Sequence, residues 1–187
     1  MAYVSRAGQK LEHALLTFAI NPTGLTCADF GSSTGGFVDC LLQHRATKVY
    51  AVETGYGVLD WKLRNDPRVV VMERTNAMHV KLPELVDLIT IDTSWTKLER
   101  VIPNAVANLK AGGKIIALVK PHYETGAQAL RNGSLPDEEI EPTLEKVKTK
   151  LSELGLMVEG QTESPIIGAK GGNREFLFLL NSGILGA

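Results

Sequence analysis

The sequence is poor in cysteine, in aromatic residues and in excess charge of either sign. Of its 187 residues two are cysteines, 6% are aromatic, and the formal net charge is −1 at pH 7. Cys27 and Cys40 lie in or beside apolar runs, so reduced, buried thiols are expected rather than a disulfide scaffold. The near-neutral charge argues against holding nucleic acid by bulk electrostatics alone and leaves room for a local basic patch.

Long apolar runs are also absent. No run reaches the roughly 18 residues of a membrane span, and the N-terminal segment MAYVSRAGQK lacks the apolar region of a signal peptide. We therefore expect a cytoplasmic protein that makes no membrane contact. The length and the 44% of apolar residues are typical of one globular domain over residues 1–187, with an N-terminal helix in 1–20 and a core in 21–181.

Short apolar segments alternate with amphipathic ones along the whole chain. Strands are expected at residues 25–30, 48–54, 68–73, 86–92, 112–121, 156–162 and 174–180. Helices are expected at 5–19, where Ser5 can cap, and at 36–44, 57–64, 96–110 and 137–154. This alternation predicts an α/β fold with a mostly parallel sheet covered on both faces. The loop at 123–137 is the least structured segment and could act as a lid.

The stretch CADFGSSTGGFVDCLLQ, residues 27–43, predicts a strand, a glycine turn and a helix. In parallel sheets ligands bind at such turns, beyond the carboxyl ends of the strands. The spacing of Gly31, Gly35 and Gly36 does not match the G-x-G-x-x-G of dinucleotide sites. Asp29 would repel a pyrophosphate but suits the ammonium and sulfonium cations of S-adenosylmethionine. The stretch therefore favours S-adenosylmethionine, with a plain tight turn as the alternative.

Further candidates follow the next two strands. Glu53 is placed to accept hydrogen bonds from both ribose hydroxyls of an adenosine, or to cap a helix. Thr75 and Asn76 are candidates for adenine contact, with a capping turn equally plausible. Trp61 could pack near the adenosine, but its helical spacing favours a core position. The full set of predicted cofactor-binding residues is Asp29, Gly31, Ser32, Ser33, Gly35, Gly36, Phe37, Glu53, Thr75, Asn76 and Asp92.

Several ordered motifs carry a family resemblance over residues 3 to about 180. They are YVSRAGQKL, DFGSSTGGF, VYAVETGYGVLDWKLRNDPRVVVMERTNA, ITIDTS and LVKP. With them the chain resembles the hemolysin-A-like (TlyA) family of ribosomal RNA methyltransferases, a branch of the FtsJ/RrmJ-like ribose 2′-O-methyltransferases. The resemblance implies a Rossmann-like, seven-stranded methyltransferase domain that uses S-adenosylmethionine and acts on ribosomal RNA or a ribosomal subunit.

The resemblance also implies a Lys-Asp-Lys-Glu catalytic tetrad, matched here by Lys10, Asp92, Lys120 and Glu175. Asp92 and Lys120 end two strands, so both side chains are expected at the sheet edge that holds the glycine turn. Lys120 is the candidate for orienting and deprotonating a 2′-hydroxyl, while Lys10 supplies a second cation or contacts RNA. Burial would favour a neutral lysine and the carboxylates a protonated one, so this balance stays open.

Some features of the chain depart from the family pattern. An S4-type RNA-binding module usually precedes the SRAGQKL motif, whereas Met1 stands almost directly before it here. Either the chain is trimmed or the protein works without the module. IDTSWTKL and KPHYETG stand where IDVSFISL and KPQFEAG are expected, and Glu53 replaces an aspartate, which leaves the acceptor-facing surface open.

Other assignments stay open as well. AKGGNRE, residues 169–175, offers Lys170 and Arg174 for a phosphate, or forms a plain hairpin turn. No histidine has a partner at metal-ligand spacing, so no metal is expected. A non-RNA acceptor, and a regulatory protein that only binds S-adenosylmethionine, remain as alternative functions. The hemolysin name suggests membrane lysis, but the sequence contains no basic amphipathic helix that could carry it out. The oligomeric state is not predicted.

Overall fold

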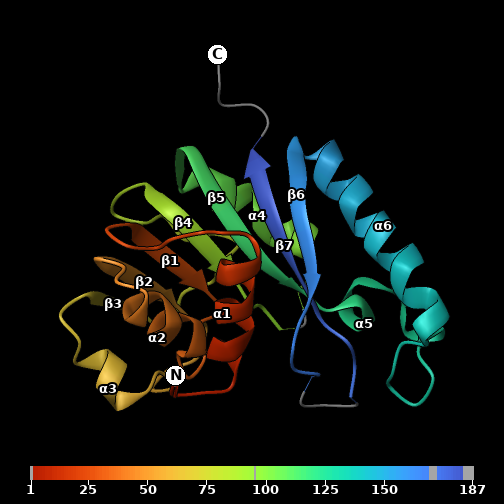
Figure 1. The fold of residues 1–187 in the computed structure, drawn as a ribbon, viewed down its shortest axis with the longest axis horizontal. Coiled ribbons are helices and arrows are strands. Elements are labelled where there is room, and N and C mark those ends of the chain that lie inside the picture. The colour runs from red at the N-terminus through yellow and green to blue at the C-terminus, as the bar shows by residue number, and fades with distance from the viewer. Residues whose placement is uncertain (1, 95, 169–171, 183–187) are drawn as a thin grey trace.

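A computed structural model describes residues 2–94, 96–168 and 172–182. Its centre is a seven-stranded sheet in the order β3-β2-β1-β4-β5-β7-β6, with helices on both faces (Figure 1). The strands are β1 (Thr26–Phe30), β2 (Lys48–Val52), β3 (Val69–Met72), β4 (Val86–Ile91), β5 (Leu109–Val119), β6 (Leu156–Glu163) and β7 (Phe176–Ser182). The predicted α/β class and the seven-stranded, mostly parallel sheet are confirmed.

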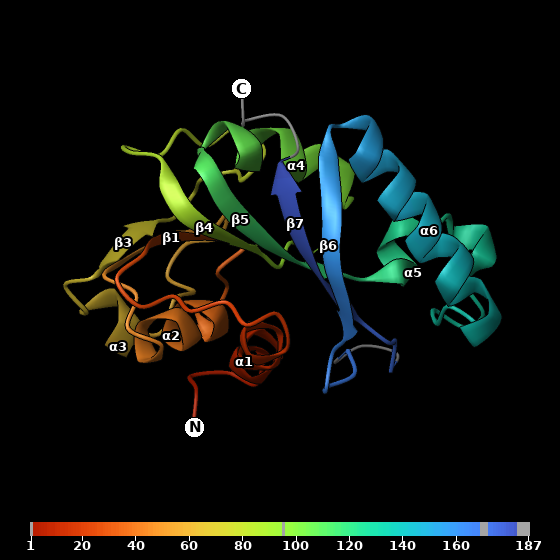
Figure 2. The same cartoon turned by 45° about the horizontal axis from the view of Figure 1, so that its top comes forward.

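The helices form two layers around this sheet. They are α1 (Ala7–Thr17), α2 (Gly36–Gln43), α3 (Trp61–Arg64), α4 (Leu98–Ala107), α5 (Pro121–Glu124) and α6 (Asp137–Glu153), with a 3₁₀ turn at Ala127–Ala129. Figure 2 shows α1, α2 and α3 on one face of the sheet and α4 and α6 on the other. Strand β5 explains how both layers are held, because Ile115 packs into the core under α4 and α6, whereas Ile116 packs into the core with α1 and α2. Apolar residues on both faces make the second half of the strand, residues 115–119, continuously hydrophobic.

One strand runs against the others. The ladders that join β1, β2, β3, β4 and β5 are parallel, whereas β7 pairs antiparallel with both β5 and β6. The carboxyl ends of β1 to β5 therefore meet at one edge of the sheet. Because β7 runs the other way, it begins at that same edge, and the residue before it, Glu175, lies there too.

Several local expectations are corrected. Helix α1 begins at Ala7 with Arg6 at the N-cap and no capping side chain, so Ser5 does not cap it. The helix expected at 57–64 shrinks to α3, because Asp60 is extended and its carboxylate accepts the Lys62 amide, which starts the helix there. Trp61 is 75% exposed and is not a core residue.

The helix expected at 96–110 and the strand expected from 112 meet earlier than predicted. Helix α4 ends at Ala107, and Asn108 follows as its C-cap. The buried Asn108 amide accepts from the Leu82 backbone and donates to the carbonyl of Val80, which fixes the turn into β5 at Leu109. The loop at 123–137 also contains the 3₁₀ turn and a bridge between Arg131 and Ser134. Within the described residues no helix is long and apolar enough to cross a membrane.

Candidate functional site

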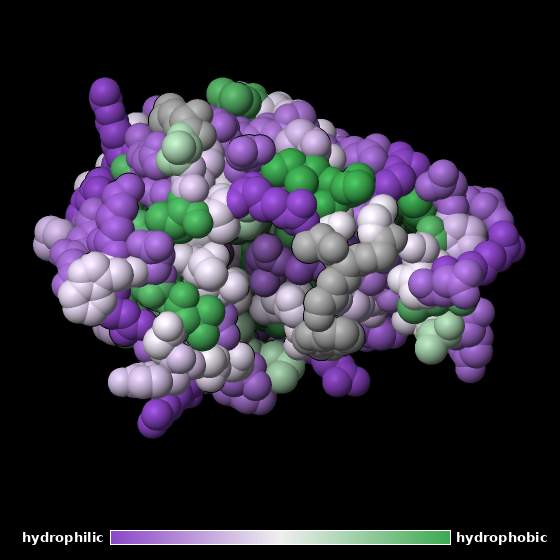
Figure 3. Space-filling view, turned by 90° about the horizontal axis from the view of Figure 1, so that it is seen from below, coloured by the Kyte–Doolittle hydropathy of each residue, from purple (hydrophilic) through white to green (hydrophobic). Residues whose placement is uncertain are grey.

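Three adjoining cavities lie at the carboxyl edge of the parallel strands. Figure 3 views the molecule from this side and shows a hollow near its centre with hydrophilic side chains in its wall. The large cavity, about 300 Å³, is lined from Gly31, Ser33, 52–54, 75–78, 92–94, Thr96 and Val101. The small cavity, about 90 Å³, is lined by Ser5, Ala7, Asp29, Gly31, Ser32, Ser33, Thr34, Gly36, Phe37 and Asp92. The lysine cavity, about 280 Å³, is lined by Ser5, Arg6, Ala7, Lys10, Ser94, Lys120, His122, Tyr123, Gly168 and Glu175.

Each of these cavities shares wall residues with the other two. Asp92 borders both the large and the small cavity, Ser5 borders the small and the lysine cavity, and Ser94 borders the large and the lysine cavity. Asp92 directly follows β4, and its backbone amide donates to the carbonyl of Phe30 at the end of β1. One continuous site therefore runs from the end of β2 across β1 and β4 to β5 and α1.

Close backbone contacts explain two of the glycines. Gly31 has φ +90°, and a Cβ added there would lie 2.5 Å from the carbonyl oxygen of Asp92. A Cβ on Gly36 would overlap the side chains of Ser5 and Ala7, so the glycine lets the start of α2 meet the start of α1. The turn is thus built for close approach between backbones as well as for tight bending. Gly35 precedes α2 as its left-handed N-cap.

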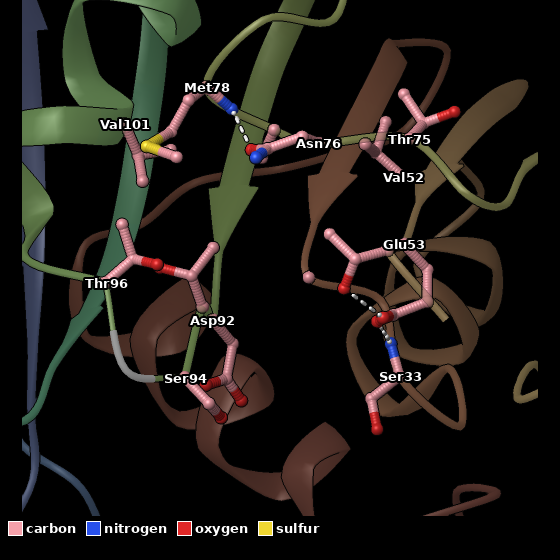
Figure 4. Close-up of a pocket in the computed structure, with 14 residues that line it drawn as sticks. Ser33, Val52, Glu53, Thr75, Asn76, Met78, Asp92, Ser94, Thr96 and Val101 are labelled. Atoms are coloured by element: carbon pink, nitrogen blue, oxygen red, sulfur yellow. Dashed lines mark hydrogen bonds between the residues drawn. The ribbon is translucent and has the colours of Figure 1, made fainter. Parts of the chain in front are cut away.

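The carboxylate of Glu53 organises the wall of the large cavity. It accepts a hydrogen bond from the amide of Ser33 at 2.9 Å (Figure 4). It accepts a second from the amide of Gly55 at 2.8 Å. A bond from the Thr54 hydroxyl adds to these. These contacts tie the glycine turn to the end of β2 and hold an anionic acceptor at the cavity wall. None of the helices in the described residues is capped by Glu53, so the alternative prediction of a helix cap is wrong.

Thr75 and Asn76 lie across the large cavity from the glycine turn (Figure 4). The Thr75 amide donates to the carbonyl of Glu53, and the side chain of Asn76 accepts from the amide of Met78 at 2.9 Å. Asn76 therefore makes the turn that was the alternative expectation and also lines the cavity. The apolar part of the same wall is formed by Met78 and Val101.

Asp29 is a buried residue in the wall of the small cavity. It is 1% exposed, and its carboxylate accepts one hydrogen bond of 2.7 Å from the Thr90 hydroxyl. Burial raises the pKa of Asp29 to about 8, against the opposing effect of that hydrogen bond. Nearby, the buried Ser32 hydroxyl has no hydrogen-bond partner among the described residues. The small cavity thus offers an acid and a free hydroxyl to a compact polar group.

Two lysine–carboxylate pairs border the lysine cavity. Lys120, which follows β5, donates to Asp92 at 2.5 Å, with side chains 11% and 20% exposed. Lys10 of α1 pairs with Glu175, with side chains 8% and 5% exposed. The four residues of the expected tetrad therefore stand as two ion pairs around one site, and Asp92 joins them to the large cavity.

Sequence reasoning missed the residues that complete the lysine cavity. Arg6 is an exposed cation in its wall and donates to the carbonyl of Ile167. His122 and Tyr123 belong to α5 and have their ring centroids 4.1 Å apart. The signal that could have found the two rings is their position directly after Lys120, at the end of a predicted strand.

Other predicted residues lie outside these cavities. Arg174 pairs with Glu163 and Asp137, so its guanidinium already has partners. Gly35 and Trp61 line none of the three cavities, and Lys170 falls outside the described residues. Within the described part of the chain, no group of three or more His, Cys, Asp or Glu could hold a metal ion.

The sheet order and a polar site at the carboxyl strand ends define an α/β methyltransferase domain. The chain belongs to the FtsJ-like methyltransferase family, whose model matches residues 3–182. It is 42% identical to "16S/23S rRNA (cytidine-2'-O)-methyltransferase TlyA" of Mycobacterium tuberculosis, over 95% of this chain and 68% of that protein. It is 40% identical to "Putative rRNA methyltransferase YqxC" of Bacillus subtilis, over 97% of this chain and 66% of that protein.

A solved structure is also similar to this chain. The "Putative hemolysin from Streptococcus thermophilus" superposes with a TM-score of 0.93 at 40% identity, over 97% of this chain and 68% of that one. The chain thus spans about two thirds of the length of the curated relatives described above. The predicted family and methyltransferase fold are confirmed.

Proposed function

We propose that this chain is an S-adenosylmethionine-dependent ribose 2′-O-methyltransferase acting on ribosomal RNA in the cytoplasm. The observation that carries the proposal is the continuity of the three cavities, with two lysine–carboxylate pairs at one end. Relatives named as ribosomal RNA cytidine 2′-O-methyltransferases support the substrate class.

S-adenosylmethionine would occupy the large and small cavities, whose polar wall residues suit its chemical groups. Glu53 would accept the ribose hydroxyls, and the wall with Thr75, Asn76 and Met78 would take the adenine. Asp29 would face a cationic part of the methionine moiety. The Ser32 hydroxyl, which has no partner among the described residues, would hydrogen-bond to the same moiety. When bound, the cofactor supplies an electrophilic methyl group. The remaining predicted contacts, Gly31, Ser33, Gly36, Phe37 and Asp92, line these cavities.

The lysine cavity would hold the nucleotide whose hydroxyl is methylated. Positioning is the largest available contribution, with an upper range of about 7 to 11 kcal/mol for well-oriented reactants. Lys120 would orient the 2′-hydroxyl and, as the neutral amine, accept its proton as the oxygen is methylated. Asp92 would then hold the resulting ammonium group in place. Lys10, held by Glu175, would add positive charge beside the developing alkoxide.

The test is transfer of a labelled methyl group from S-adenosylmethionine to ribosomal RNA and to ribosomal subunits. A 2′-O-methyl group blocks attack by the neighbouring hydroxyl, so the label is expected in alkali-resistant dinucleotides. Lys120→Ala should lose at least about 100-fold in rate, within the range for acid–base groups. The matched control is Lys114→Ala on β5, the strand that Lys120 follows; Lys114 pairs with Glu159 outside the three cavities.

Two results would contradict the proposal. Equal activity of Lys120→Ala and wild type would show that methyl transfer does not depend on Lys120 in the lysine cavity. Cofactor binding without label in any ribosomal RNA or subunit would favour a different acceptor or a regulatory role.

A further inference from the structure

His122 is a polar group in the wall of the lysine cavity that the proposed reaction does not use. It lies two residues after Lys120, and its ring is half-buried against that of Tyr123, with 48° between the ring planes. Its Nδ1 is buried and has no hydrogen-bond partner among the described residues. Because Nδ1 is covered, it reaches a ligand in the cavity by rotation of the ring, and the cost of leaving it without a partner favours that rotation.

The helical turn that carries His122 is firmly held. Pro121 is buried, and the amide of Tyr123 donates to the carbonyl of Lys120 at 2.8 Å. One residue further on, the carboxylate of Glu124 accepts the amide of Leu98 at the start of α4, at 2.9 Å. The backbone that places His122 in the wall of the lysine cavity is therefore held before any substrate arrives, which reduces the ordering cost of binding.

His122 differs from its charged neighbours in the hydrogen bonds that it can make. The ammonium groups of Lys10 and Lys120 only donate, and the carboxylates of Glu175 and Asp92 already accept from them. Burial lowers the pKa of His122 below its usual value; Glu175 opposes this shift, and Lys120 adds to it. At neutral pH the ring is thus uncharged and has one donor and one acceptor nitrogen.

We infer that His122 is a binding residue for the acceptor nucleotide, and that its uncharged imidazole accepts a hydrogen bond from a hydroxyl or amino hydrogen of that nucleotide. The ring of Tyr123 supports the imidazole from the side. This inference rests on the proposed function, because it assigns a further contact within the same acceptor site. It makes His122 a determinant of acceptor affinity, distinct from the residues that bind the cofactor.

Two variants test the inference in the full chain. His122→Phe keeps a flat ring but cannot hydrogen-bond, so KM for ribosomal RNA should rise about 3- to 10-fold at pH 7.5 with little change in kcat. His122→Gln keeps an acceptor and a donor and should stay within about 2-fold of wild type. The dissociation constant for S-adenosylmethionine should be the same in all three proteins.

The pH profile supplies a readout that a purely structural role would not change. As the pH falls through the lowered pKa of His122, protonation removes the acceptor nitrogen of the ring, whereas the glutamine amide does not titrate. The ratio of kcat/KM for wild type to that for His122→Gln should therefore fall at acidic pH. The other titratable residues of the lysine cavity are the same in both proteins, so their titration largely cancels in the ratio. They are Arg6, Lys10, Lys120, Tyr123 and Glu175.

The outcomes separate this inference from the proposed function. If wild type methylates no ribosomal RNA, the proposed function fails and this contact fails with it. If wild type is active but His122→Phe has a wild-type KM, or the ratio does not change with pH, only the inference about His122 is overturned.

Discussion

Lys10 and Glu175, which are 165 residues apart in the sequence, form a buried ion pair between the first helix and the start of the last strand. The pair exists because β7 runs antiparallel and so begins at the edge where the parallel strands end. The site is thereby closed by residues from both ends of the chain. The site therefore forms only when the whole chain is folded. Variants of Lys10 and Glu175 can show how much of their effect is on stability and how much is on activity.

Removing one partner of this pair should be strongly destabilising. Glu175→Gln leaves the Lys10 ammonium buried without a counter-charge, so the free energy of unfolding should fall by about 3 kcal/mol. The double variant Lys10→Met/Glu175→Gln should recover most of that loss but none of the methyl transfer. Urea denaturation and the labelled-methyl assay measure the two effects.

An exposed pair provides the control for this measurement. Lys148 pairs with Glu145 on the surface of α6, so Lys148→Met should cost at most about 1 kcal/mol. If Glu175→Gln lowered the free energy of unfolding no more than this control, the Lys10 ammonium would be able to reach water without its partner.

The buried acid Asp29 predicts an unusual dependence of stability on pH. Its folded-state pKa of about 8 lies above the usual value of 3.8, so between these values the folded state binds more protons than the unfolded state. Its contribution to the free energy of unfolding is fully present below about pH 4 and is lost as pH rises to 8. The slope is at most about 1.4 kcal/mol per pH unit. Asp29→Asn should remove this component, seen as the difference between the two proteins in urea titrations from pH 5 to pH 8.

The same carboxyl group should couple cofactor binding to proton release. A cationic part of S-adenosylmethionine beside Asp29 favours the ionised acid, so affinity should rise about 3- to 10-fold from pH 6.5 to 8. Calorimetry in buffers of different ionisation enthalpy should detect a proton released at pH 7. Asp29→Asn should bind weakly and show neither effect. A wild-type affinity that stays constant over this range would contradict the placement of the cation.

The glycine turn can be tested against a glycine in open space. Gly31→Ala must accommodate φ +90° and a contact with the Asp92 carbonyl, whereas Gly24→Ala, at φ +80°, meets nothing within 4 Å. Both substitutions carry the strain of a left-handed backbone, about 1 to 2 kcal/mol. Only Gly31→Ala should lose further stability and also weaken S-adenosylmethionine binding, as measured by thermal melting with and without the cofactor. Equal losses of stability in the two variants would mean that the glycine turn can shift to accept the side chain introduced by Gly31→Ala without a further loss of free energy.

Local patterns in the sequence predicted the strands, the glycine turn and the acids beside it. These features depend on near neighbours: continuous apolar runs bury both faces of a strand, and glycines mark positions where a side chain cannot fit. Asp29 and Glu53 could be placed at the site because a strand and its turn fix them together. For the same reason the strands could be predicted more reliably than the ends of the helices around them.

Tertiary structure alone decided the features that depend on packing between distant segments. The antiparallel course of β7 pairs Lys10 with Glu175, and the short α3 leaves Trp61 on the surface. The fixed turn after β5 brings His122 into the lysine cavity. Periodicity records only which face of a segment is buried, and it carries no information on which distant segment covers that face. The sequence by itself thus determined the fold class and the residues of the turn, while packing determined which charges meet and what surrounds them.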